Sequence, residues 1–385
     1  MVVVIGAGPG GLAAAAMLQH VGFRVLVLER GEVAAAWRSR YDRLHLHTVR
    51  WLSCLPGYPM PRSYGRWPSR DSVIEYLQRY AERAALEVRT SVEVKRLDRI
   101  GGAWKVVTAG GVIEAERVVV ATGYSNVPYL PDWPGSFSGR IVHSADYRNP
   151  VGYAGRRVLV VGAGNSGGEI AIDVADGGAE EVLLAVRTVP TIVRRDTFGV
   201  PSQLLGIATA HLPTPLVDWI GSTIRRITIP DLTQQGLPAP VRPYSDFLRR
   251  RVIPILDVGL VDAVREGRVR VVAALERFED GGAVLADGGR LRVDDVIAAT
   301  GYRPALEGLV GHLGVLDDRG EPLVHAAREH RQAPGLHFIG YQVTLGGTFR
   351  LIGIEAKQLA RALSARRSSG TAVPGDRVEG LARGN

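Results

Sequence analysis

Two short stretches decide the fold of this chain: "VVVIGAGPGG" (residues 2–11) and "RVLVVGAGNSGG" (residues 157–168). Each begins with a run of β-branched apolar residues and continues into closely spaced glycines. The spacing is the same in both stretches: Gly6, Gly8 and Gly11 in the first, and Gly162, Gly164 and Gly167 in the second. In this pattern the first glycine permits a tight turn, the second lets backbone approach a pyrophosphate, and the third lets helix and strand pack closely.

The residues that follow each stretch support the same interpretation. After the first we expect a helix over about residues 11–21 and a strand "RVLVLE" ending at Glu29. After the second we expect a helix over about residues 166–174 and a strand "EVLLAVR" ending at Arg187. Apolar strands joined by an alanine-rich helix are typical of a parallel sheet that is buried on both faces.

The repetition extends further along the chain. "VTAGGVIEAERVVVATGY" (residues 107–124) and "LADGGRLRVDDVIAATGY" (residues 285–302) share one order: a Gly-Gly hairpin, an acidic stretch and a strand. The strands end in Thr122-Gly123 and Thr300-Gly301. A layout used twice predicts an α/β fold with two Rossmann-like dinucleotide-binding domains.

We place the first domain at residues 1–150 and 291–385, and the second, inserted domain at residues 151–290. The proline-rich stretch 126–135 is interpreted as a linker. The tail after about residue 365 has the composition of a disordered end.

The residue at the end of the second strand of each unit, which we call its closing residue, indicates the nucleotide that the unit binds. Glu29 can accept hydrogen bonds from ribose hydroxyls and would repel a 2′-phosphate, so the first domain suits FAD or, failing that, NAD. Arg187, followed by Thr188, favours the 2′-phosphate of NADPH, and Arg194 and Arg195 would complete the clamp. The alternative is that Arg187 is a surface charge.

Bulk composition excludes several classes of protein. The chain is 46% hydrophobic, has no apolar run long enough to span a bilayer, and is expected to be soluble and cytoplasmic. The net charge is +8, but the basic residues are dispersed among acids, so we expect no nucleic-acid partner. The histidines lack metal-ligand spacing, which predicts no metal site. Cys54 is the only cysteine, which excludes an intrachain redox-active disulfide.

Residues about 198–250 form a predicted helical lid within the second domain. The part from Phe198 to Ile229 is rich in Leu and Ile and is interrupted by prolines. We expect two short helices that cover a substrate channel; peripheral contact with a membrane surface is the alternative. Residues 335–363 are expected to return to the first domain as strand, loop and helix.

A motif between the two glycine-rich units identifies a family. "FSGRIVHSADY" (residues 137–147) carries Phe-x-Gly-x-x-x-His-x-x-x-Tyr and resembles the identifying sequence of class B flavin-containing monooxygenases. Its ending in Tyr147 is similar to the N-/S-oxygenating and YUCCA-like branch. Residues 41–61, 162–174 and 254–272 resemble YUCCA-like segments in the same order. His143 and Tyr147 either fix the linker between the domains or take part in the chemistry.

The resemblance implies an NADPH- and O₂-dependent flavoprotein monooxygenase with a small-molecule substrate. In such enzymes NADPH reduces FAD and oxygen adds to flavin C4a to give a (hydro)peroxide. The expected reaction is oxidative decarboxylation of an aryl-2-oxo acid such as indole-3-pyruvate, or N- or S-oxygenation of a small metabolite. The alternative is an NADPH-dependent reductase that passes electrons to a quinone or a partner protein. The oligomeric state stays open.

The resemblance also assigns residues. His47 stands where animal-type relatives carry Asn, so it is either a hydrogen-bond donor in catalysis or a packed structural histidine. Trp37 and Arg38 are expected near the flavin ring, although "AAAW" (residues 34–37) lacks the glycines usual in the family. The further predicted cofactor-binding residues are Arg30, Thr122, Gly123, Asn165, Ser166, Thr300, Gly301 and Gly340.

Overall fold

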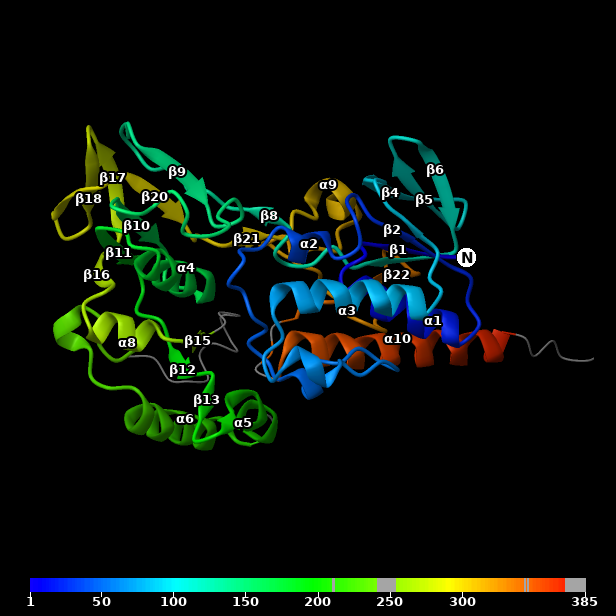
Figure 1. The fold of residues 1–385 in the computed structure, drawn as a ribbon. Helices are drawn as coiled ribbons and strands as arrows, with labels where there is room; N and C mark the ends of the chain where they lie inside the picture. Colours follow the sequence, from blue (N-terminus) through cyan, green and yellow to red (C-terminus); the bar gives the residue numbers. More distant parts are fainter. Residues whose placement is uncertain (210–211, 241–253, 343, 345, 371–385) are drawn as a thin grey trace, which may run out of the picture.

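The computed structural model describes residues 1–209, 212–240, 254–342, 344 and 346–370. It has two lobes, each built on a five-stranded parallel sheet (Figure 1). The predicted α/β class with two Rossmann-like units is confirmed. The predicted tail lies mostly outside the described residues, but helix α10 (Thr348–Gly370) runs past residue 365.

The first sheet has the order β22-β7-β1-β2-β3. Its strands are β22 (Leu336–Phe338), β7 (Arg117–Val120), β1 (Val2–Ile5), β2 (Val25–Leu28) and β3 (Val88–Arg89). One face is covered by α1 (Pro9–His20), α3 (Arg70–Arg83) and α10, and the other by the meander β4 (Val94–Ile100), β5 (Ala103–Thr108) and β6 (Gly111–Ala115) with α9 (Glu307–Val310) (Figure 1).

Alternation along β1 explains the two layers. Val2 and Val4 belong to the core under the helices, whereas Val3 and Ile5 belong to the core under the meander. Successive side chains of a strand point to opposite faces, so a continuous run of four apolar residues places two side chains in each core.

The second sheet repeats the plan with the order β16-β11-β10-β20-β9. Its strands are β16 (Arg270–Ala273), β11 (Glu181–Val186), β10 (Arg157–Val161), β20 (Asp295–Ala298) and β9 (Arg140–His143). Helices α4 (Asn165–Asp176) and α8 (Leu260–Arg265) cover one face, and the meander β17 (Leu275–Glu279), β18 (Gly282–Leu285) and β19 (Arg290–Arg292) covers the other.

The pairing of β9 and β20 corrects the predicted domain boundaries. Boundaries at 150 and 291 assign both strands to the first domain, yet each lies in the second sheet, where β20 pairs with β10 and with β9. The predicted linker also carries a short strand, β8 (Val127–Pro128), which pairs with β21 (Tyr302–Arg303) on the returning segment. The chain therefore crosses between the lobes twice, along two adjacent segments.

An insertion after β11 forms the lower part of the second lobe (Figure 1). It contains β12 (Ile192–Arg194), β13 (Asp196–Thr197), β14 (Val200–Pro201), α5 (Ser202–Thr209), α6 (Thr214–Thr228) and β15 (Ile255–Asp257). The two predicted helices are present, and the part of the predicted lid from residue 241 to 250 lies outside the described residues.

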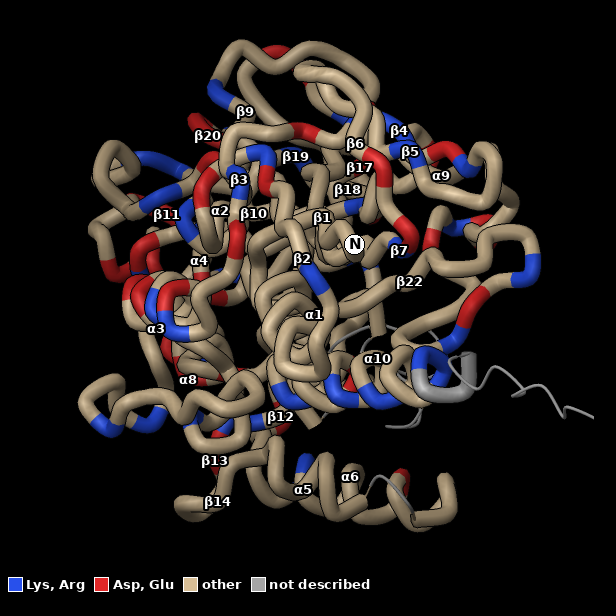
Figure 2. Tube along the Cα trace, turned by 90° about the vertical axis from the view of Figure 1, so that its right-hand side faces the viewer, with Lys and Arg blue, Asp and Glu red and all other residues tan. Residues whose placement is uncertain are grey.

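The shorter elements complete the described chain. They are α2 (Ala35–Arg38) and the 3₁₀ turns η1 (Arg50–Leu52), η2 (Arg62–Tyr64), η3 (Thr233–Gln235) and η4 (Gly311–Leu313). Figure 2 shows Lys and Arg interspersed with Asp and Glu along the trace. No helix of the described chain combines the length and apolarity that a bilayer crossing needs.

Candidate functional site

The first and third glycines of each unit are required by the chain itself. A Cβ on Gly11 would lie 1.8 Å from the Gly6 carbonyl oxygen, and one on Gly167 would lie 1.8 Å from that of Gly162. Gly6 and Gly162 also have positive φ, 105° and 110°. These four positions therefore explain the turn and the close packing of helix on strand.

The second glycines are different. Gly8 and Gly164 have extended backbone, and a Cβ on either would meet nothing within 4 Å. Neither conformation nor packing within the described chain calls for glycine there, so the space is available to a bound group. Each glycine is the N-cap of its helix, without a side-chain cap or an acid in the first turn, as an anion at the helix N-terminus needs. Both sites therefore fit the pyrophosphate of a dinucleotide.

Glu29 closes the first unit. It is buried, and its carboxylate accepts hydrogen bonds from the amides of Ala7 (2.7 Å) and Gly31 (2.9 Å). A carboxylate has about four acceptor sites, so two amides leave capacity for ribose hydroxyls. Arg30, the next residue, is exposed.

The second unit differs from the prediction by one residue. The amide of Gly6 bonds to the carbonyl of Leu28, and that of Gly162 bonds to the carbonyl of Ala185. Register therefore matches Glu29 with Val186, and Arg187 occupies the place of Arg30. The loss of the acid at this position removes the repulsion of a 2′-phosphate. Arg187 and Thr188 are exposed, and the side chain of Arg187 makes no hydrogen bond or ion pair with another described residue.

The side chains of two predicted residues of the second unit already bind other residues of the protein. Arg194, expected in a phosphate clamp, forms ion pairs with Asp257 (2.7 Å) and Asp262 (3.1 Å). The carboxamide of Asn165 accepts from the amide of Leu256 (2.7 Å) and donates to the carbonyl of Pro254 (3.3 Å). Because these contacts fix the side chains in the second domain, a clamp role for Arg194 is not supported.

Arg195 lies elsewhere, at the contact between the lobes. Its guanidinium stacks over Trp67 at 4.6 Å, and burial lowers its pKa. It joins a segment of the first lobe to the insertion of the second.

The two predicted Thr-Gly pairs follow β7 and β20. Thr122 shares a hydrogen bond of 2.8 Å with Tyr341, and Thr300 donates to the carbonyl of Tyr129. The carbonyl of Gly301 is bonded to Nε2 of His143 at 3.0 Å. The glycines at 123 and 301 have positive φ, 81° and 91°, as expected where the chain turns away from a strand.

The motif at residues 137–147 is built into the second lobe. Phe137 stacks on Phe278 with ring centroids 5.0 Å apart. A Cβ on Gly139 would lie 2.5 Å from the carbonyl oxygen of Asp294. Tyr147 is buried and donates to Asp173 on α4 at 2.7 Å. These contacts dock β9 and its flanks onto the sheet.

His143 is held in one tautomer. Its Nδ1 accepts from the amide of Ala145 (3.1 Å), so Nε2 carries the hydrogen that is donated to Gly301. Burial lowers the pKa of His143, which favours this neutral form. The ring packs edge-on against Tyr302 at 5.1 Å. The geometry supports the structural role, because His143 ties β9 to the returning crossover.

His47 meets a partner that the sequence did not suggest. Its Nε2 contacts the carboxylate of Glu169, a buried residue of α4, 122 positions along the chain. The hydroxyl of Tyr41 interacts with Glu169 and Ser166, and burial raises its pKa well above the ordinary value. His47 and Tyr41 come from the first lobe, so this cluster joins that lobe to α4. We call the glycine turn and helix N-terminus of each unit its glycine cradle: Gly6, Gly8 and Gly11 in the first, and Gly162, Gly164 and Gly167, before and in α4, in the second.

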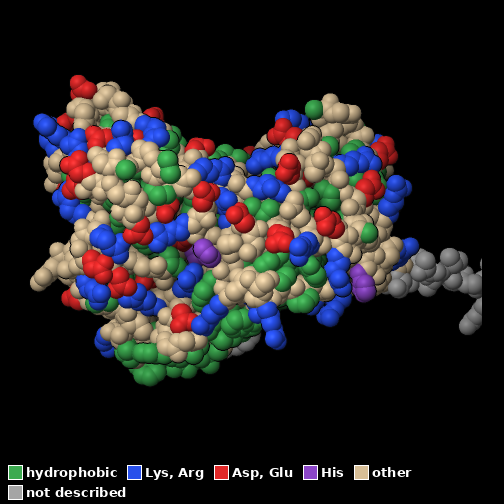
Figure 3. Space-filling view, viewed as in Figure 1, with side chains coloured by type: hydrophobic (Ala, Val, Ile, Leu, Met, Phe, Trp, Pro, Cys, Tyr) green, Lys and Arg blue, Asp and Glu red, His purple; other side chains and the backbone are tan. Residues whose placement is uncertain are grey.

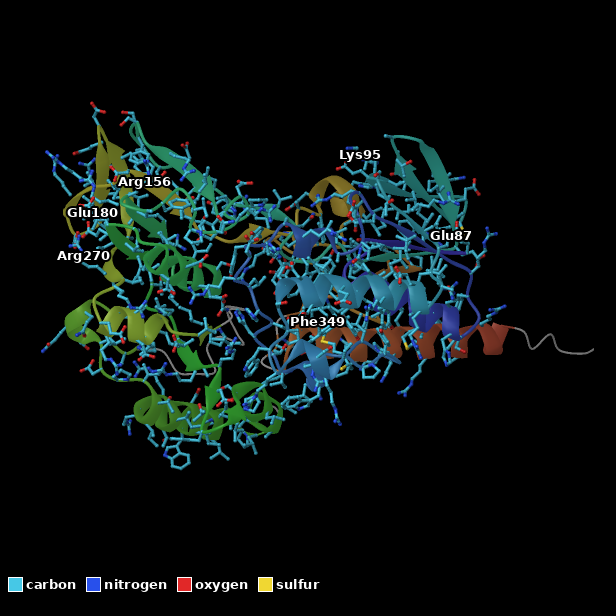
Figure 4. The ribbon with its side chains drawn as sticks, in the orientation of Figure 1. Glu87, Lys95, Arg156, Glu180, Arg270 and Phe349 are labelled. Atoms are coloured by element: carbon cyan, nitrogen blue, oxygen red, sulfur yellow. The ribbon has the colours of Figure 1, made fainter. Side chains whose placement is uncertain are left out.

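The predicted flavin-side residues lie beside the first cradle. The amide of Ala34 donates to the carbonyl of Ala7 (3.1 Å), inside the glycine turn. Ala34 takes a positive φ of 64°, so alanine occupies a conformation that glycine prefers. Trp37 packs edge-on against Phe349, at the start of α10 (Figure 4), with ring centroids 5.9 Å apart. Arg38 pairs with Glu32 at 3.3 Å.

The C-terminal loop is fixed by a buried acid. Glu355 accepts from the amide of Gly340 and from the side chain of Gln342, both at 2.9 Å. Burial raises the pKa of Glu355 to about 6. Gly340 therefore acts in this structure through its backbone, with a positive φ of 84°.

Gln203 of α5 is a further residue that sequence reasoning missed. It is buried, accepts from the amide of Val49 (3.0 Å) and donates to the carbonyl of Gly346 (2.8 Å). One side chain thus joins the insertion, the loop after His47 and the loop before α10. Residues 49, 203 and 346 lie more than 100 positions apart in the sequence, so no local sequence pattern predicts the contact.

Comparisons with known proteins agree with this architecture. A sequence model of the pyridine nucleotide-disulphide oxidoreductase family matches residues 3–197. The indole-3-pyruvate monooxygenase YUCCA1 of Oryza sativa subsp. japonica is 37% identical over 352 residues, which cover 88% of this chain and 86% of the relative. The probable indole-3-pyruvate monooxygenase YUCCA3 of Arabidopsis thaliana is 32% identical, over 88% of this chain and 81% of that protein.

Solved structures show the same two-lobed arrangement. A flavin-containing monooxygenase from Stenotrophomonas maltophilia superposes with a TM-score of 0.72 at 28% identity, over 95% of this chain and 98% of that one. Closed cyclohexanone monooxygenase gives a TM-score of 0.73 at 18% identity, over 95% and 84% of the two chains, which supports the fold alone.

Proposed function

The chain belongs to the YUCCA family of flavin-dependent monooxygenases, and we propose that it uses FAD, NADPH and O₂ to decarboxylate an aryl-2-oxo acid oxidatively. Indole-3-pyruvate is the first candidate, because the curated relatives above carry that substrate in their names. The balanced reaction takes one oxo acid, one NADPH, one proton and one O₂. It yields the carboxylic acid shortened by one carbon, CO₂, NADP⁺ and water.

One observation carries the proposal: two glycine cradles of the same geometry are closed by different residues, an acid in one and an apolar residue followed by a cation in the other. Glu29 beside the first cradle suits the unphosphorylated ribose of FAD. Val186 followed by Arg187 beside the second suits the 2′-phosphate of NADPH. When bound, the flavin supplies the redox chemistry with hydride and dioxygen, and the protein orients the ligands and excludes water.

His47 is proposed as a hydrogen-bond donor to the reacting groups, oriented by Glu169. With Nε2 held by the carboxylate, Nδ1 is the ring nitrogen left for a reaction partner, and it can donate when both ring nitrogens carry hydrogen, a form that the neighbouring carboxylate favours. A His47→Ala enzyme should retain flavin and consume NADPH, but form less product for each NADPH. Unchanged coupling, accompanied by lower thermal stability, would assign His47 a packing role.

The decisive experiment supplies isotopically labelled dioxygen and a panel of aryl-2-oxo acids, thioethers and tertiary amines. We expect one labelled oxygen in the shortened acid and one CO₂ for each NADPH. Label in a sulfoxide or an N-oxide, with no decarboxylation, would replace the proposed substrate class by N- or S-oxygenation. NADPH-dependent quinone reduction with no label in any product would favour the reductase.

A further inference from the structure

A cavity of about 610 Å³ lies where the loop after His47 faces the insertion. Its walls include Arg50, Trp51, Arg62 and Arg66 from the first lobe, and Val200 and Leu204 from the insertion. Trp51 lies two residues from Val49, and Leu204 follows Gln203, so the cavity borders the junction that Gln203 makes. None of the described residues that line it is acidic.

The three arginines differ in their freedom. Arg50 donates to the carbonyls of Met60 (2.8 Å) and Gly65 (3.1 Å), which fixes its guanidinium at the wall. Arg66 donates to the carbonyl of Gly199 (2.6 Å) and pairs with Asp196 (2.6 Å).

The side chain of Arg62 is exposed, and its guanidinium makes no hydrogen bond or ion pair with another described residue. One carboxylate against three guanidinium groups leaves the cavity positively charged. Arg62 is the cation that can pair with a ligand without first losing a protein partner.

The other walls are apolar and exposed. Trp51 is 49% exposed and Val200 is 54% exposed, although both are large hydrophobic residues. Covering them would remove apolar surface from water, and the indole ring of Trp51 offers a face for stacking. Figure 3 shows hydrophobic side chains gathered along the lower edge of the second lobe, over α5 and α6. A cation beside an aromatic wall is complementary to an aryl ring that carries a carboxylate.

We propose that this cavity is a recognition site for aromatic carboxylic acids, in which Arg62 pairs with the carboxylate and Trp51 contacts the ring. The inference rests on the proposed function, because it assigns residues that select the aryl-2-oxo acid class. Arg50 and Arg66 add positive potential from fixed positions. A neutral or cationic aromatic amine lacks the group that Arg62 recognises.

The test measures binding to the oxidised holoenzyme without NADPH, so turnover plays no part. The probes are indole-3-propionate, which has no oxo group to react, and 3-(indol-3-yl)propan-1-ol, its neutral analogue. Titration calorimetry should show that Arg62→Ala weakens binding of the acid about tenfold or more and leaves the alcohol unchanged. Arg62→Lys should restore part of the affinity for the acid, and Trp51→Ala should weaken both probes.

Arg99→Ala is the matched control, because Arg99 is another exposed arginine and lies on β4, away from the cavity lining. It should bind both probes as the parent does. Equal affinity of the parent and Arg62→Ala for the acid would overturn the proposal. Arg62-dependent binding to vesicles of three parts phosphatidylcholine and one part phosphatidylserine, without binding of the acid, would also overturn it and assign the surface to lipid.

The two proposals can fail separately. If Arg62→Ala weakens acid binding but no oxo acid is oxygenated, the decarboxylase function falls and the recognition site stands. If oxo acids are decarboxylated and Arg62→Ala binds the acid normally, the recognition site falls and the function stands.

Discussion

The two lobes share an architecture but differ in the residues that close their cradles. Each has a parallel sheet with helices on one face and a three-stranded meander on the other, and each has a glycine cradle at the start of its first helix. They differ at the end of the neighbouring strand, where Glu29 stands in one lobe and Val186-Arg187 in the other. Backbone geometry in both lobes therefore fits a dinucleotide, and we propose that one or two side chains choose which one.

The residues that join the lobes are not part of the repeat. His47 and Tyr41 of the first lobe reach Glu169 on the second, while Gln203 of the second reaches the loops of the first. The two crossovers pair with each other, through the short strands β8 and β21, and not with either five-stranded sheet. The way the lobes sit against each other therefore also depends on the contacts of His47, Tyr41 and Gln203. The contact is thus specified by residues that the two lobes do not have in common.

The largest effect should come from the third glycines. Gly11→Ala or Gly167→Ala would place a methyl group 1.8 Å from a carbonyl oxygen. Each should cost about 3 kcal/mol or more of unfolding free energy, because backbone must move. Thermal unfolding of both variants checks this. Gly308→Ala is the control, because a Cβ there meets nothing within 4 Å. If either third-glycine variant unfolded at the parent's temperature, the two turns would not be equivalent.

The second glycines should separate the cofactors without unfolding the protein. Gly8→Val should cost at most about 1 kcal/mol of stability but take the purified protein from a full complement of flavin to almost none. Gly164→Val should keep the flavin and lose NADPH binding. Flavin absorbance and NADPH titration distinguish the two. The comparison breaks if Gly164→Val is the variant that loses flavin.

The closing residues should set the preference between NADPH and NADH. Arg187→Ala should weaken NADPH about tenfold to a hundredfold and leave NADH unchanged, since one or two charge-assisted hydrogen bonds are lost. Val186→Glu copies Glu29 into the second lobe and should disfavour NADPH further. Affinities measured for both nucleotides check this. An unchanged ratio for Arg187→Ala would leave that residue as a surface charge.

The smallest expected effect is the change of folding stability with pH, which should have opposite signs in the two lobes. Glu355 has a pKa of about 6, above its ordinary value, so its stabilising contribution is full below about 4.5 and falls as pH rises to 6, by about 2 kcal/mol. The Arg157 guanidinium lowers the pKa of Asp294 to about 2, so its contribution is present above about 4 and is lost as pH falls. Glu355→Gln should flatten the first change and Asp294→Asn the second.

Unfolding temperature measured from pH 2 to pH 7 tests both assignments. If Asp294→Asn altered the profile above pH 5 and Glu355→Gln did not, the assignments would be reversed.

Local sequence predicted what depends on neighbours in the chain. The glycine spacing, the apolar strands and the helices after them were all predicted, because turn geometry and hydrophobic periodicity act over a few residues. Edge strand β9 escaped prediction since it is short, half-exposed and recognisable only by its pairing with β20, about 155 residues later. The one-residue offset of Arg187 escaped for the same reason: register is a property of two strands.

By itself the sequence determined that this chain would form two Rossmann-like units, with an acid after the second strand of the first unit and no acid at the end of that strand in the second. Tertiary structure decided which groups remain free to act. Arg194 is paired with Asp257 and Asp262, and His47 contacts Glu169. The guanidinium of Arg62 lies at a cavity wall without a partner among the described residues. The reason is physical: a side chain's availability depends on whether a distant residue satisfies its charge, and that is known only once the chain has folded.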